Sequence, residues 1–151
     1  MASADITAKN TLVAGVNSPN NYIRSEAHLI DGTENPGVLA ADTHSLFKLP
    51  AGSAVTGLTI VSLATATSSG SATAQFKVKV GTSDAEAMHT AVALADLAAG
   101  DTAKFLTTKI KGYEADKEPL IQLTVGTAAF TALKLLVIVE YLPVSDFMTA
   151  G

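Results

Sequence analysis

The sequence predicts an all-β fold, an antiparallel β-sandwich or jelly roll of about eight strands with an extended N-terminal arm. Apolar and polar residues alternate in several short stretches, and clusters of Gly, Ser and Pro separate those stretches. Only 16% of the 151 residues are charged, although 48% are hydrophobic, so Thr, Ser, Gly and Asn must supply much of the polar surface. We expect one domain, with an arm at 1–21, the sandwich at 22–143 and a tail at 144–151.

The clearest local pattern covers residues 45–65, which predicts a strand, a tight turn and a second strand paired as a hairpin. Pro50 fixes φ inside a Leu-Pro-Ala-Gly turn, and Gly52 suits the positive φ that such turns often need. The second strand, expected at 54–63, contains Gly57, which predicts a bulge or a close backbone approach.

Two further strands are expected before this hairpin, at 11–16 and 22–30, separated by a turn-forming cluster of Asn, Ser and Pro. The strand at 22–30 alternates between two kinds of side chain, which is typical of a half-buried strand. One face carries Arg24, Glu26 and His28, and the other carries Ile23, Ser25, Ala27 and Leu29.

Four strands are expected after the hairpin, at 72–80, 103–111, 120–125 and 133–142. The last is apolar on both faces at its middle, so we expect it to be central in a sheet or covered by another subunit. Residues 82–100 are ambiguous because Ser83 and Glu86 fit a helix capping box. We favour a helical turn or loop there, followed by a brief strand near 91–94.

The sequence offers no catalytic constellation, and we expect no enzyme, cofactor or metal site. His28 and Glu26 share a strand face and would allow an incidental metal contact, but a solvated histidine is the simpler interpretation. The acidic loop at 114–118 lacks the wider ligand ladder of a calcium loop. The carboxylate pairs are of the type that glycosidases use, but aromatic residues are too scarce for a sugar-stacking cleft. These pairs are Asp84 with Glu86 and Asp96 with Asp101.

The net charge and the hydropathy of the chain limit the classes of partner that it can bind. The net charge of -4 argues against nucleic acid, because phosphate binding needs clustered Lys and Arg. The longest apolar run, at 135–139, is too short to cross a bilayer, and no membrane association is expected. The N-terminus lacks a signal-peptide pattern, so we expect synthesis in the cytoplasm without export. The absence of cysteine excludes a disulfide framework.

Three stretches resemble the small β-sandwich virion proteins of tailed bacteriophages, most closely the capsid decoration (cement) proteins. They are the strand–turn–strand at 47–57, the strand ending Val-Lys-Val-Gly-Thr-Ser at 78–83, and the closing Leu-Val-Ile-Val-Glu-Tyr at 136–141. The resemblance implies a non-enzymatic homotrimer on the capsid surface of the virion, made in the host cytoplasm, that binds and stabilises the shell of major capsid protein. It equally allows a tail, neck or fibre component with a receptor- or glycan-binding jelly roll.

The resemblance also implies two contact regions. In the first, apolar residues of the arm and of the strand after it order on the capsid or on a neighbouring protomer, with a frayed terminus as the alternative. In the second, the outer face of the last strand forms the subunit interface, with a two-sided interior of one subunit as the alternative. The residues are Leu12, Val13, Val16, Tyr22 and Ile23 for the first region, and Leu136 and Ile138 for the second.

Overall fold

The computed structural model describes residues 23–106 and 114–144, and these form eleven strands joined by turns and two short 3-10 helices. The strands are β1 (Arg24–Asp31), β2 (Thr43–Lys48), β3 (Ser53–Ser62), β4 (Thr67–Ser68), β5 (Thr73–Lys79), β6 (Glu86–Ala87), β7 (Val92–Ala93), β8 (Thr102–Leu106), β9 (Leu120–Gly126), β10 (Phe130–Ala132) and β11 (Lys134–Pro143). The 3-10 helices are η2 (Pro36–Leu39) and η3 (Leu94–Asp96). In these parts of the chain, no helix is long and apolar enough to cross a membrane.

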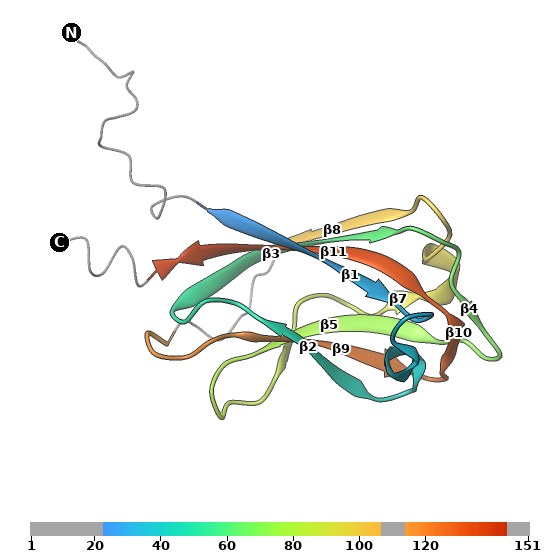
Figure 1. Cartoon of the computed structure of the whole chain (residues 1–151), viewed down its shortest axis with the longest axis horizontal. Helices are drawn as coiled ribbons and strands as arrows, with labels where there is room; N and C mark the ends of the chain where they lie inside the picture. The colour runs from blue at the N-terminus through green and yellow to red at the C-terminus, as the bar shows by residue number, and fades with distance from the viewer. Residues whose placement is uncertain (1–22, 107–113, 145–151) are drawn as a thin grey trace, which may run out of the picture.

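Two antiparallel sheets pack against each other as a sandwich (Figure 1). The first sheet has the order β1-β11-β3-β8, and the second has the order β2-β9-β5-β6, with β7 also on β5. β10 and β4 form a small separate ribbon. The predicted all-β antiparallel sandwich is therefore confirmed, with more strands than the eight expected. The pattern could not reveal β4, β6 and β7, because a strand of two residues is too short to show an alternation.

The core lies between the two sheets and follows the predicted alternation. On β11, Leu135, Val137 and Val139 are fully buried, and the residues between them are partly exposed. β11 lies between β1 and β3, so the predicted central position of this strand is confirmed. The inward side chains of the second sheet are likewise those that the alternation placed on one face: Phe76, Val78 and Val80, and Ile121, Leu123 and Val125.

The expected hairpin at 45–65 is wrong in its pairing, although its strands and its turn both form. Gly52 has a φ of 77°, and the Ser53 N–H donates to the Pro50 carbonyl at 3.2 Å. However, β2 pairs with β9 in the second sheet, and β3 pairs with β11 and β8 in the first. The turn therefore carries the chain from one sheet to the other. The Gly52 N–H bonds to the Lys117 carbonyl at 3.0 Å, which fixes the turn to the loop before β9.

The β-bulge predicted at Gly57 is confirmed. Gly57 lies opposite Glu140, and the next pair joins Tyr141 to Val55, so Thr56 is the extra residue of a β-bulge. A Cβ atom at Gly57 would lie 2.9 Å from Glu140 Oε1 and 3.4 Å from the Phe105 carbonyl oxygen. The Glu140 side chain therefore lies over Gly57, whereas the backbone of β8 is at an ordinary contact distance.

The ambiguous segment forms no α-helix, and its capping-box residue Glu86 lies in β6. The brief strand expected near 91–94 is confirmed as β7. The helical turn comes after this strand, as η3, and not before it. Local helical propensity is overridden because residues 86–93 pair with β5.

Candidate interaction surface

The outer face of the first sheet is apolar at its centre. Leu136 and Ile138 point away from the second sheet and are partly exposed, although β11 is central in its sheet. Residues paired directly across neighbouring strands share a face, so the register extends this surface onto β1 and β3. We call it the outer apolar face, and its members are Leu29, Leu136 and Val61 in one row and Ala27, Ile138 and Thr59 in the next.

Strand β1 contributes apolar side chains to this surface, because its charged side chains point toward the second sheet. Ala27 and Leu29 are exposed, and Leu29 retains 53% of its accessible area. Glu26 and His28 point to the other side, where they are half-buried. In an isolated sandwich this orientation of β1 is unfavourable, because it exposes a leucine to water and partly removes a carboxylate from water. This orientation therefore favours a partner on the outer face.

The outer face of the second sheet has the opposite chemistry. Its central strands β5 and β9 present polar or basic side chains over most of their length, and β2 continues the rows. The rows are Gln75, Thr124 and Thr43, then Lys77, Gln122 and Ser45, then Lys79, Leu120 and Lys48. This face suits water, whereas the outer apolar face suits a protein neighbour.

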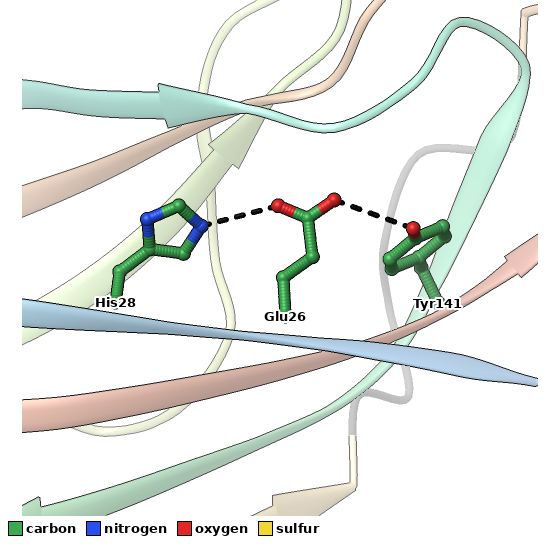
Figure 2. Close-up of polar contacts among 3 residues, drawn as sticks. All are labelled: Glu26, His28 and Tyr141. Atoms are coloured by element: carbon green, nitrogen blue, oxygen red, sulfur yellow. Dashed lines mark hydrogen bonds and ion pairs between the residues drawn. The ribbon is translucent and has the colours of Figure 1, made fainter.

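The charged side of β1 forms a polar cluster with β11 at the open edge of the sandwich. Figure 2 shows Glu26 between the other two residues, with His28 Nε2 3.1 Å from its Oε1 and the Tyr141 hydroxyl donating to its Oε2 at 3.3 Å. Burial, and secondarily the Glu26 charge, raise the pKa of Tyr141 above its usual value of 10.0. The His28 ring also stacks on Phe47 of β2, with centroids 3.6 Å apart and planes 10° apart. The cluster thus joins both sheets at this edge.

A hollow of about 720 Å³ lies beside this cluster, between β1, β2 and η2. Its lining includes His28, His44 and Glu34, together with Phe47 and Val38. Within the described ranges, no three residues of the His, Cys, Asp and Glu types are grouped closely enough to hold a metal ion. The two histidines in this lining make structural contacts: His44 bonds the Ala40 carbonyl, and His28 bonds Glu26 and stacks on Phe47.

Of the carboxylate pairs that the sequence singled out, Asp96 and Asp101 both line a hollow of about 460 Å³. Asp101 Oδ2 accepts the Ala98 N–H at 3.0 Å, which fixes the turn before β8. In the acidic loop, Asp116 lies 3.8 Å from the Lys117 ammonium as an exposed ion pair. Asp101 therefore stabilises a turn, and Asp116 is an exposed surface residue.

The structure places some of the predicted contact residues. Leu136 and Ile138 lie at the centre of the outer apolar face, and Ile23 lies just before β1 with 61% of its area exposed. The sequence did not indicate that Leu29, Ala27, Val61 and Thr59 adjoin them, because that proximity depends on the strand order. The remaining arm residues, Leu12, Val13, Val16 and Tyr22, lie outside the described residues.

No family model and no curated protein sequence matches the chain. Among solved structures, it is similar to a chain described as "Cyanophage Pam1 capsid asymmetric unit", with a TM-score of 0.57 and 18% identity. The match covers 93% of this chain and 98% of the other, so the two are nearly equal in length. The protein therefore shares its fold, over almost its whole length, with a chain from a phage capsid.

Proposed function

We propose that this chain is a non-catalytic structural protein of a tailed-phage virion, which decorates the capsid and stabilises its shell. The observation that carries the proposal is the structural likeness, nearly end to end, to a chain from a cyanophage capsid. A binding role also agrees with an apolar surface on one face of the sandwich and a polar surface on the other.

The outer apolar face is the proposed contact between copies of the chain in a homotrimer. Leu136 and Ile138 lie at its centre, and the ion pair of Lys134 with Asp31, 4.0 Å apart, lies at its rim. An apolar centre with charges at the edge is the usual anatomy of a protein interface.

The major capsid protein is the proposed second partner. Its contact region is the arm and the start of β1, with Leu12, Val13, Val16, Tyr22 and Ile23 as the contributing residues. No contact with nucleic acid or membrane is proposed. A protein that binds the assembled shell but not free subunits stabilises the shell by its binding free energy, and a trimer that engages several subunits adds avidity.

The test combines the oligomeric state with binding to shells that lack the protein. Light scattering should give a trimer, and the trimer should cosediment with purified shells. Leu136→Asp with Ile138→Asp should yield a folded monomer, because buried carboxylates would oppose association. Gln122→Asp is the matched control, since it adds charge at the centre of the polar outer face. A wild-type monomer without affinity for shells would remove the proposal.

A tail, neck or fibre component with a receptor- or glycan-binding jelly roll is the alternative outcome. Labelled protein would then appear at the tail or neck in micrographs of the particle, and shells without it would keep their stability. Rings or polymers in place of trimers would point to a tail-tube or neck component.

A further inference from the structure

Residues 86–93 run along the edge of β5 that faces away from β9, and we call them the strap. One end, β6, pairs with Lys77 and Val78, and the other end, β7, pairs with Thr73 and Ala74. Between these two short pairings, Met88 and His89 lie beside Phe76 in the middle of β5. The strap therefore covers the edge of a strand that would otherwise offer free hydrogen-bonding groups.

His89 completes the hydrogen bonding of β5 between the two short pairings. Its Nε2 accepts the Phe76 N–H of β5 at 3.0 Å, and the neighbouring Met88 N–H donates to the Phe76 carbonyl at 2.9 Å. Because Nε2 is an acceptor, the ring is neutral and carries its proton on Nδ1, which lies 2.6 Å from the Thr90 carbonyl. The imidazole thus accepts the Phe76 N–H in place of a backbone carbonyl of the strap.

The same ring reaches the first sheet. It stacks on Phe105 of β8, with centroids 4.4 Å apart and planes 12° apart. The Gln75 side chain also donates to the His89 carbonyl at 2.9 Å. One half-buried histidine therefore holds the strap to β5 and bridges the two sheets at the edge opposite the His28–Phe47 stack.

We propose that the strap is an acid-released cover: uptake of a second proton by His89 breaks its bond to Phe76, frees the strap and exposes the edge of β5. Protonated Nε2 would carry a hydrogen pointing at the Phe76 N–H, which would lose its acceptor. At neutral pH the buried Met88 side chain and the stacked ring keep the strap in place. The exposed edge would be a template for a strand of a second copy.

The surroundings of His89 agree with release in acid. The groups that contact it from β5 and β8 are Phe76, Gln75 and Phe105, all uncharged. The hollow lined by Thr90 and Phe105 also contains the carboxylates of Asp96 and Asp101. Burial lowers the pKa of His89 below 6.5, and the Thr90 carbonyl opposes this in part. Because the native pKa is the lower one, the closed strap is fully stable above pH 6.5 and loses stability as the pH falls through that value.

The test is amide hydrogen exchange at Phe76, corrected for the intrinsic exchange rate, between neutral pH and about pH 5. Its protection should fall by up to about tenfold for each pH unit below 6.5, because the open strap binds one more proton. His89→Gln places an uncharged acceptor near the Nε2 position and should remove this dependence. His44→Gln is the matched control, since His44 lies on β2 and bonds the Ala40 carbonyl at 2.8 Å. It should leave the dependence unchanged.

Nitrogen chemical shifts of the His89 ring in the unmodified protein provide a second measurement, in case His89→Gln does not fold. At neutral pH they should show a proton on Nδ1 and none on Nε2. A proton on Nε2 at neutral pH, or Phe76 protection that does not change with pH in the wild type, would overturn the proposal.

Discussion

Tyr141 shows how one residue can tie two strands at an open edge. Its ring is buried with 4% exposure, and its hydroxyl donates to Glu26 on the neighbouring strand at 3.3 Å. Ionisation of the phenol would put a second negative charge next to the carboxylate. The native protein therefore holds the neutral phenol, and the pKa of Tyr141 is raised for two reasons, first burial and then Glu26.

Alkaline titration tests the raised pKa of Tyr141. Its raised pKa means that its contribution to stability is complete below pH 10 and is lost as the pH rises through the native pKa. Absorbance titration should thus show one phenol ionising above 10.0, and Tyr141→Phe should remove that step. Glu26→Gln should shift the step downward, and Tyr113→Phe should leave it unchanged. A phenol step above pH 10.0 that persists in Tyr141→Phe would contradict this expectation.

Contacts of this kind could not be predicted from the sequence, and the reason is distance along the chain. Tyr141 and Glu26 are 115 positions apart. The sequence suggested a solvated histidine at His28 and gave no role to His89, because nothing at short spacing marks Phe47 or Phe105 as their stacking partners. Strand periodicity assigns a side chain to a face, but strand order decides which residues meet on that face.

At the scale of elements, β11 is where the sequence was most informative. Its alternation correctly separated the buried residues from Leu136 and Ile138, and its apolar middle correctly predicted a central strand. The turn at Pro50–Gly52 was also predicted correctly, but the hairpin was not. A turn motif fixes the local backbone, whereas the pairing of the strands beside it depends on β9 and β11, which lie much later in the chain.

Alanine substitutions along β11 test the two faces directly. Leu135→Ala removes a fully buried side chain and should lower the free energy of unfolding by about 2–5 kcal/mol. Leu136→Ala, the adjacent matched control, should cost less than about 1 kcal/mol in the monomer, because its side chain is already partly exposed. Urea unfolding of the two variants, at protein concentrations low enough to keep the chain monomeric, measures both losses of free energy. Equal losses would mean that the outer apolar face is already covered within one chain.

At the scale of the whole molecule, the two outer faces differ in chemistry although the sheets share one core. A sandwich that functions as a monomer could have polar side chains on both of its outer faces. Here the second sheet presents lysine, glutamine and threonine, while the first presents leucine, isoleucine and valine at its centre. The sequence predicted the apolar outer residues of β11, but the contribution of β1 appears only once its charged side is seen to point inward.

The proposed decoration role predicts that the stabilisation of a shell depends on the concentration of this protein, as mass action requires. If the trimer binds only the assembled shell, each occupied site should add about 2.7 kcal/mol when free protein exceeds the dissociation constant a hundredfold. Calorimetry of shells that lack the protein should then show a disruption temperature that rises with added wild type and saturates. Leu136→Asp with Ile138→Asp should need far more protein, because a monomer loses the avidity of several linked contacts. Gln122→Asp should follow the wild-type curve. A disruption temperature that does not change with the concentration of the wild type would contradict the proposed stabilisation of the shell.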